Sequence, residues 1–359
     1  MRFYRITFYN EDNSVANHVV NPFESHSRLG KYNPGCLEVE FDITNAFGNS
    51  QAPPFHLRIY SPTLEMVKNA RSYNGLKVNI EGGFKSGLPL ANPFQSGLVG
   101  AGYVLSCYAN YIGTDLAMDF IIAPTKDLGG PDLSYAPVKN GINCPVPYSF
   151  VWGGEQNPTQ TFMQALGVTF GALGISVTGT VDPRLDLTPL QARTSFKTTF
   201  VEFAKDIQDM TLSMLAPPSL QSSGTGQQQK YSGVWLGFYA STNKVLAFDG
   251  TEPSKPIFLG PEEFIGQPTW VTESGVLQSV HPMRADLAIG FTVRYPNNIP
   301  QYIDASLGKA ASRLSINASA VPLSVFQVRH VGRYRDMSAT GWATYLNAGS
   351  RVITNPNPS

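Results

Sequence analysis

The sequence predicts a mainly β protein of the α+β class, in which a helical region is inserted between two β-rich regions. Alternation of polar and apolar residues, the period of a half-buried strand, recurs through the first hundred residues. Apolar residues at helical spacing follow in the middle of the chain, and alternation returns in the last third. The length of 359 residues exceeds one ordinary core and indicates roughly two or three packed units.

We expect three domains along the chain. A first β domain covers residues 1–125, a connection with a helical domain covers 126–228, and a second β domain with a C-terminal tail covers 229–359. These boundaries follow the change from alternating to helical spacing and back again.

Strand patterns in the first domain end at residues that favour turns. The clearest pattern covers residues 37–43, in which apolar and acidic residues alternate. Segments 55–59 and 76–80 repeat the alternation, with glycine and proline at their ends. Between these two segments, Thr63 can cap a short helix over residues 63–70. The first domain is therefore predicted to be strand-dominated.

The middle of the chain predicts an irregular connection followed by two helices. Residues 124–158 are rich in proline, glycine and asparagine, which prevents any long regular element. The first helix is predicted from one apolar stripe, formed by Phe162, Leu166, Phe170 and Leu173. The second is expected to begin with Thr188 as its cap and Pro189 at its first position, because large apolar residues recur every three or four positions from Phe196 to Met214. We interpret both stripes as core packing.

Strands are expected to return after a polar loop. The alanine-proline-proline sequence at 216–218 ends the second helix, and residues 222–229 hold too few apolar groups to pack. The later strand patterns cover 234–238, 276–280, 287–295, 325–331 and the alternating Trp342, Thr344 and Leu346. A second β domain is therefore predicted to close the chain.

The composition favours assembly over nucleic-acid or membrane binding. Hydrophobic residues make up 42% of the chain and charged residues only 14%, with a formal net charge of zero. Weakly charged surfaces associate more readily, and binding to phosphate backbones needs clustered Lys and Arg that this chain lacks. The N-terminus alternates polar and apolar residues, and no run of about 18 apolar residues occurs. We expect neither a signal peptide nor a membrane span, and synthesis in a cytoplasm.

Cysteine and histidine positions give little support for a metal site. The cysteines are Cys36, Cys107 and Cys144, and their wide spacing without CxxC pairs favours free buried thiols. No HExxH motif and no i,i+4 pair occurs among the five histidines, which are His18, His26, His56, His281 and His330. His56 and His330 fall inside strand patterns, where cross-strand or core packing is the favoured interpretation.

Catalytic motifs are also lacking in the sequence. No GxSxG elbow occurs, and the glycine-rich segment 97–102 lacks the GK[ST] ending of a phosphate loop, so we interpret it as a loop before a strand. Acidic neighbours could in principle cleave glycosides, but ordinary surface acids are the favoured interpretation of Glu262 with Glu263 and of Asp115 with Asp119. We therefore predict no catalytic, cofactor-binding or metal-binding residues, and no enzymatic activity.

The first domain resembles the central baseplate hub proteins of contractile-tailed phages. The sequence LRIYSPTLE at 57–65, followed by NGLKVNIEGGF at 74–84, resembles the strand, short helix and strand of that family. The second strand ends, as in the family, in a small-residue aromatic turn.

The C-terminal part resembles the final barrel of the same family. FIGQP at 264–268 and a His281-Pro282 turn are followed by FQVRHVG at 326–332 and GWATYLNA at 341–348. The last two are similar to the His-Gly turn and the terminal Trp-x-Thr strand of the hub. This chain departs from the pattern in that Val331 separates His330 from Gly332, and the turn acid, Asp336, comes later.

The resemblance implies two tube-like β-barrels per chain with the helical domain between them, assembled as a homotrimer around a channel. Three chains would then present six barrels and adapt a three-fold spike to the six-fold tail tube. The implied partners are the central spike protein, the tail tube or tube-initiator protein and the baseplate wedge proteins, with DNA only passing through. No cofactor is implied, and the location is the tail baseplate of the virion.

Two other functions stay open on the sequence alone. One is a tail-associated peptidoglycan hydrolase, although no separate enzymatic domain is visible. The other is a glycan-binding receptor-recognition protein, in which tryptophans stack on sugars; the candidates are Trp152, Trp235, Trp270 and Trp342.

Overall fold

A computed structural model describes the fold over most of the chain. The described residues are 1–10, 14–16, 23–27, 29–47, 54–85, 92–112, 115–123, 138–139, 142–143, 148–155, 159–186, 189–215, 233–239, 242, 244–249, 255–271, 276–296, 302–303 and 322–349. Several sequence-based predictions lie outside the described residues, namely most of the connection 124–158, the segments 216–218 and 222–229, Thr188 and Cys144.

Strands and helices follow one another along the chain in three groups. The first group holds β1 (Arg2–Tyr9), β2 (Phe23–Glu24), β3 (Val39–Ala46), β4 (Phe55–Tyr60), α1 (Leu64–Lys68), η1 (Ala70–Tyr73), β5 (Lys77–Phe84), η2 (Pro93–Gln95), β6 (Gly97–Ile112) and β7 (Asp115–Ala123). The middle group holds β8 (Val138–Lys139), β9 (Ile142–Asn143), β10 (Tyr148–Trp152), α2 (Phe162–Gly171), β11 (Ser176–Thr180), η4 (Pro183–Asp186), β12 (Arg193–Lys197), α3 (Phe200–Leu215), β13 (Trp235–Tyr239) and β14 (Lys244–Phe248). The last group holds β15 (Ile257–Phe258), η6 (Pro261–Glu263), β16 (Thr269–Val271), β17 (Val276–Pro282), β18 (Thr292–Arg294), β19 (Tyr302–Ile303), β20 (Leu323–Arg333), η8 (Ala339–Gly341) and β21 (Trp342–Gly349).

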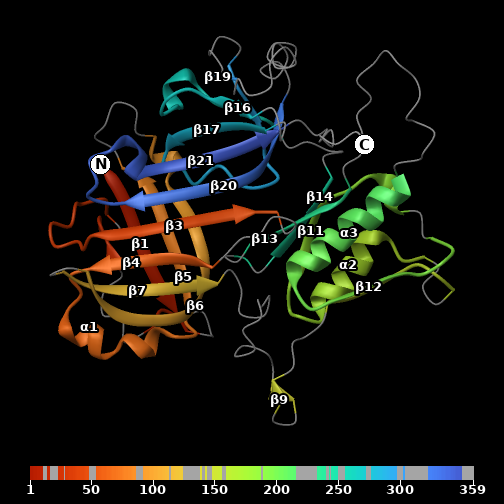
Figure 1. The fold of residues 1–359 in the computed structure, drawn as a ribbon, viewed down its shortest axis with the longest axis horizontal. Coiled ribbons are helices and arrows are strands. Elements are labelled where there is room, and N and C mark those ends of the chain that lie inside the picture. The colour runs from red at the N-terminus through yellow and green to blue at the C-terminus, as the bar shows by residue number, and fades with distance from the viewer. Residues whose placement is uncertain are drawn as a thin grey trace.

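One 14-stranded sheet is shared by both β regions. Its main path is β19-β16-β17-β21-β20-β3-β4-β7-β6-β5-β1-β2, and β18 joins it at β20 with β15 at its side. Figure 1 shows β17, β21, β20, β3, β4 and β7 as one layer, with β1, β5 and β6 crossing behind. The predicted mainly β class is confirmed. The barrels are not closed among the described residues, because β3 and β20, one edge of each region, pair with each other.

The first β region encloses one hydrophobic core. Alternate residues of its strands point inward, as Ile6, Phe41 and Phe120 do, which is the pattern predicted from the alternation. Helix α1 begins after Thr63, whose side chain accepts a hydrogen bond from the Met66 amide at 3.2 Å, as expected for the cap. Trp342 of β21 also belongs to this core, so the end of the chain packs into its beginning.

Helices α2 and α3 pack on two small sheets in a second core. Thr161 caps α2 through a capping box with Gln164, and the predicted stripe is buried at Phe162, Leu166 and Phe170. The small sheets are β10-β12 and β11-β14-β13. Because β13 and β14 supply buried residues to this core, it includes residues beyond 228. A third core lies in the last β region.

The second helix begins later than the sequence predicts. Residues 193–197 form β12, paired antiparallel with β10, and Phe196 on this strand is 64% exposed. Helix α3 starts at Phe200, where the Thr199 hydroxyl accepts a hydrogen bond from the Glu202 amide at 3.3 Å. A pairing partner distant in sequence, together with this local cap, overrides the helical spacing of the apolar residues.

Three segments expected as turns or loops are strands. Segment 97–102 begins β6, where its glycines admit close neighbours: a side chain at Gly100 would overlap Ile43. His281 and Pro282 end β17, where pairing with β21 on one side holds them extended. The segment 330–332 lies inside β20 and is held extended by ladder partners on both sides, β3 and β21. Conversely, only Thr292–Arg294 of the predicted strand 287–295 is a strand.

Candidate assembly site

The two β regions meet in an antiparallel ladder between β3 and β20. Its register pairs run from Gln327 opposite Ala46 to Arg333 opposite Glu40. On the outer face, Arg329 binds the Asp42 carboxylate through both Nε, 2.7 Å from Oδ1, and Nη2. Both side chains are almost half exposed, so the pair aligns the strands and contributes only about 0–1 kcal/mol.

The inner side of this ladder is closed by aromatic packing. Gly332 lies opposite Phe41, and a side chain at Gly332 would overlap the Phe41 ring. The Phe41 ring also meets Trp342 edge to face, with centroids 5.4 Å apart, and the Trp342 indole donates a hydrogen bond to the Gly83 carbonyl at 2.9 Å. The ladder therefore continues the first core instead of lying on its surface.

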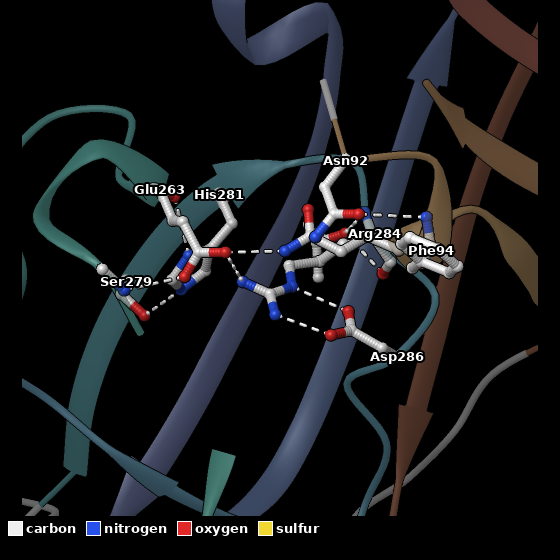
Figure 2. Close-up of polar contacts among 10 residues, drawn as sticks. Asn92, Phe94, Glu263, Ser279, His281, Arg284 and Asp286 are labelled. Atoms are coloured by element: carbon white, nitrogen blue, oxygen red, sulfur yellow. Dashed lines mark hydrogen bonds and ion pairs between the residues drawn. The ribbon is translucent and has the colours of Figure 1, made fainter. Parts of the chain in front are cut away.

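An ion-pair network centred on the buried Arg284 lies beside the ladder (Figure 2). Arg284 is 3% exposed; its Nη2 is 2.6 Å and its Nε 2.7 Å from the Asp286 carboxylate, and its Nη1 is 3.0 Å from Oε1 of Glu263. Burial opposes the charge of Arg284, but Asp286 and Glu263 outweigh it and raise the pKa of the guanidinium. The two acids together compensate the buried cation.

The same network also connects the first β region to the last through hydrogen bonds. The Gln95 side chain donates to Oε1 of Glu263 at 2.6 Å, and the Gln95 carbonyl accepts from the Ala285 amide at 2.7 Å. Asn92 accepts from the Phe94 amide at 3.1 Å, which fixes the turn that carries the 95% exposed Phe94 ring. Figure 2 shows Asn92, Phe94 and Glu263 close to Arg284.

A serine and a histidine lie in contact next to Arg284, but in the interior. The Ser279 hydroxyl is 2.8 Å from Nε2 of His281 and 2.8 Å from the Tyr295 hydroxyl, while Nδ1 of His281 is 2.9 Å from the Glu263 carbonyl. Burial, helped by the charge of Arg284, lowers the pKa of His281 to about 4, so the ring is neutral. With Ser279 3% and His281 0% exposed, the pair is closed to a substrate and holds the strands together.

We call the β3–β20 ladder, together with the Arg284 network beside it, the seam. A second histidine of the seam, His330, is bound in the same way as His281. His330 on β20 is 2% exposed, and its Nδ1 is 3.0 Å from the Thr344 hydroxyl of β21. That hydroxyl also accepts from the Arg284 amide at 3.0 Å. Burial lowers the pKa of His330 to about 4. This agrees with the interpretation of His330 as a satisfied core residue, whereas His56 lies exposed on the outer face of β4.

Each β region contains the same arrangement of four antiparallel strands. The four-strand unit is β3-β4-β7-β6 in the first region and β16-β17-β21-β20 in the last: two hairpins joined through their second strands. The second hairpin of both units carries a register shift at the same place, with the extra residue at Leu105 in β6 and at Phe326 in β20. The units therefore correspond residue by residue, which the sequence alone did not reveal.

Charges on the outer face of the first region's strands are paired. Arg58 binds Asp119, which also accepts from the Asn110 side chain at 2.9 Å, and Tyr60 donates to Glu40 at 2.9 Å. Burial raises the pKa of Asp119, but the hydrogen bonds from Arg58 and Asn110 outweigh it and leave the pKa below its ordinary value. This face is polar and internally compensated.

The acids noted in the sequence, and those of the noted tryptophans and thiols whose side chains the structure describes, take structural positions. Asp119 and Glu263 bind arginines, as above, and their neighbours Asp115 and Glu262 are exposed. Trp152 and Trp342 are buried, and Trp235 packs against Phe47 and Phe326, with ring centroids 5.6 Å and 5.5 Å away. The described cysteines, Cys36 and Cys107, are buried free thiols, as predicted.

Three further observations bear on ligands and membranes. In the part of the chain that the structure describes, no group of three or more His, Cys, Asp or Glu side chains is placed to hold a metal ion. No described helix is long and apolar enough to cross a membrane. A cavity of about 90 Å³ lies where β3, β6, β13 and β20 approach one another, lined mainly by apolar residues together with Asn45, Tyr239 and His330.

Comparisons with known proteins find structural likeness only. No family model and no curated protein matches the chain. Among solved structures, the chain is similar to the 43 kDa tail protein of prophage MuSo2 from Shewanella oneidensis, with a TM-score of 0.48 and 9% identity over 98% of this chain and 97% of that one. It is also similar to a tail protein from Neisseria meningitidis MC58, with a TM-score of 0.45 and 8% identity over 98% of both chains.

A third similar structure is a component of the E. coli type VI secretion system, described as structurally similar to the T4 bacteriophage tail proteins gp27 and gp5. Its TM-score is 0.45, with 9% identity over 89% of this chain and 76% of that one. The three structures are thus two tail proteins and one secretion-system component.

Sequence reasoning missed the residues that hold the seam together. Arg284 and Asp286 lie outside any motif. Glu263, which binds Arg284, belongs to a separate segment, and Gln95, which binds Glu263, belongs to the first β region. The only available signal was an Arg and an Asp two positions apart within an otherwise apolar stretch, a pattern that is also common on surfaces.

Proposed function

We propose that this chain is a structural subunit of a phage tail, a baseplate hub that assembles as a homotrimer around a channel. The observation that carries the proposal is the repeated four-strand unit, in which the first strand of one unit, β3, pairs with an unlike strand of the other, β20. A contact between unlike edges can be repeated from copy to copy, and it closes into a ring when the rotation permits. Three chains would supply six such units.

Such a ring suits partners of different symmetry. Three chains offer three-fold contacts to the central spike protein, while six similar units offer near six-fold contacts to the tail tube or tube-initiator protein. Baseplate wedge proteins would bind the periphery. We retain the division into domains 1–125, 126–228 and 229–359 as part of this proposal, with β13 and β14 of the last domain packed into the core of the middle one. The chain is located in the tail baseplate of the virion after synthesis in the host cytoplasm.

We assign the outer face of the shared sheet to the channel wall. Its arginines are matched by acids, as in the pairs Arg58 with Asp119 and Arg329 with Asp42. Phosphate backbones are retained by clustered, unpaired Lys and Arg. A compensated polar wall therefore supports passage of the genome without retention.

The oligomeric state of the purified chain tests the proposal. Light scattering coupled to size exclusion is expected to give three times the mass of 39.1 kDa, and negative-stain images are expected to contain rings with three-fold symmetry. A chain that stays monomeric at its highest soluble concentration would contradict the hub assignment.

The proposal includes that the chain performs no catalysis. Zymography on peptidoglycan is expected to give no cleared band, and a cleared band would favour a tail-associated hydrolase instead. Glycan-array binding that is lost in Trp235→Ala while the fold is retained would favour a receptor-recognition protein.

A further inference from the structure

The edge of β6 in the first four-strand unit and the edge of β16 in the last have no described contact like the β3–β20 ladder. The inference drawn from these two edges rests on the proposed ring. In the last unit, β20 pairs with β18 near its start and with β3 over residues 327–333. In the first unit, β6 pairs with β5 only as far as Tyr103. The next residues on that edge bond to residues 74–76, at Val104 through the backbone and at Cys107 through the Asn74 side chain, and no described strand pairs with the edge beyond Cys107. The later half of β6 is thus placed like the half of β20 that binds β3.

Counting from the register shift aligns the two strands residue by residue. Asn110 is the fifth residue after the extra residue of β6, and Val331 is the fifth after that of β20. Asp42 of β3 and Thr269 of β16 also correspond. Each pairs with a residue on the second strand of its unit, and that residue lies opposite the first residue pair that follows the register shift in the second hairpin. Since Val331 pairs with Asp42, Asn110 and Thr269 occupy the equivalent positions on the edges of β6 and β16.

The exposure of the core-side residues differs between the β3–β20 ladder, which is internal to one chain, and the edge of β6. At the internal ladder, the core-side residues His330 and Gly332 are buried. Their counterparts on β6, Ala109 and Tyr111, are exposed, with Tyr111 73% exposed. A surface that β3 covers in one unit is bare in the other, which is what an edge that awaits a second copy would present.

The matching edge of β16 is occupied by a very short strand. Tyr302–Ile303, as β19, pairs in parallel with Thr269 and Trp270 only. Two residues make a weak edge cover, and parallel pairing is slightly less stable per residue than antiparallel pairing. This cover can therefore be displaced by a longer antiparallel partner.

We propose that β6 of one chain pairs antiparallel with β16 of a second copy and takes the place of β19. The register inherited from the internal ladder places Tyr108 opposite Val271, Ala109 opposite Trp270 and Asn110 opposite Thr269. Pro268 has no amide hydrogen and ends the ladder. The arginine–acid pair of the internal ladder is replaced at this contact by the uncharged Tyr108 and Thr269, in keeping with a weakly charged assembly surface.

Paired cysteines test this register directly. The backbone bonds from Tyr334 to Val39 and from Phe47 to Phe326 alternate along the internal ladder so that Val331 and Asp42 form a non-hydrogen-bonded pair. The equivalent Asn110→Cys, Thr269→Cys variant would bring its Cα atoms to about 4.5 Å, within the range of a disulfide. Mild oxidation is expected to link chains into covalent trimers on a non-reducing gel.

Two control variants show whether a disulfide reports the proposed register or a chance collision between chains. Asp42→Cys with Val331→Cys tests the same geometry at the internal ladder and is expected to form a disulfide within one chain. Ala109→Cys with Thr269→Cys would place its side chains on opposite faces of the sheet and is expected to give no inter-chain link above the level of the single variants.

The outcomes distinguish the register from the ring itself. Trimers by light scattering that form no disulfide through Asn110→Cys and Thr269→Cys overturn the register and leave the hub proposal standing. Equal cross-linking in the opposite-face control also overturns the register. A chain that is monomeric throughout overturns both.

The proposed displacement of β19 is tested by a separate measurement of trimer stability. Tyr302→Pro with Ile303→Pro removes both amide donors of β19, so trimers are expected to persist at roughly fivefold lower protein concentration, the factor that corresponds to the loss of one typical hydrogen bond. Unchanged or weaker association in light scattering would overturn the claim that β6 takes the place of β19.

Discussion

At the scale of single residues, the seam depends on buried polar side chains that satisfy one another. Arg284 is compensated by Asp286 and Glu263, and the two seam histidines stay neutral against hydroxyl and carbonyl partners. Buried groups of this kind contribute little when complete but cost much when one partner is lost. The seam is therefore sensitive to single substitutions in its interior and tolerant on its outer face.

Arg284→Leu is expected to be strongly destabilising because it leaves two carboxylates near the interior without their cation. The expected loss is about 3–5 kcal/mol in the free energy of unfolding, measured by urea titration. Arg329→Leu, which removes a bidentate pair that is nearly half exposed, is the matched control and should cost about 1 kcal/mol or less. Equal losses in the two variants would contradict the structural role given to Arg284.

The seam histidines predict a pH dependence of stability. Burial lowers the pKa of His281 and His330 from 6.5 to about 4, so the unfolded chain binds protons first as the pH falls. Their contribution is therefore complete above about pH 6.5, decreases down to pH 4 and is lost below it. Between pH 6.5 and pH 4 each histidine therefore lowers the free energy of unfolding by about 3 kcal/mol. Urea titrations across this range should be flatter in pH for His281→Gln with His330→Gln than for the parent chain.

At the scale of elements, close packing of glycine decides where strands can pair. β20 meets β3 through Gly332, which leaves room for the Phe41 ring, and β6 meets the first core through Gly100 against Ile43. A glycine-rich stretch would usually indicate a loop, but here the missing side chains allow neighbouring groups to approach. In α2, by contrast, Gly167 faces open space.

Substitutions at Gly332 and Gly167 should distinguish a glycine packed against a neighbouring ring from one that faces open space. Gly332→Ala is expected to destabilise by about 1–3 kcal/mol through overlap with Phe41, and Phe41→Leu in the same chain should recover part of that loss. Gly167→Ala should stabilise by about 0.5–1 kcal/mol, because it improves helix propensity without a new contact. Thermal unfolding of the four variants measures both effects; additive losses for Gly332→Ala and Phe41→Leu would argue against the packing.

At the scale of the whole molecule, the first and last thirds of the chain form one structure. The shared sheet and the placement of Trp342 in the first core mean that neither β region completes its packing alone. We therefore expect the β regions to unfold together, although each belongs to a different part of the sequence.

Truncation tests this dependence. A chain that ends at residue 321 lacks β20 and β21 and bares the edge of β3, so it is expected to be insoluble or to show unfolding at markedly lower urea concentration. A chain that ends at residue 349 keeps every described strand and is the control. A soluble, cooperatively folded 1–321 chain would show that the first β region is independent.

The sequence by itself determined the β-rich character, the inserted helices and the burial of alternate residues. These follow from local periodicity, as in Val39, Phe41 and Ile43, and from the cap at Thr63. The start of the second helix was wrong, because the partner strand β10 holds residues 193–197 extended. Only the tertiary structure decided the β3–β20 ladder, the Arg284 network and the repeated unit. The ladder joins residues hundreds of positions apart, and the network includes the contact between Gln95 and Glu263 across the two β regions. Such contacts depend on register and shape, which no short-range pattern records.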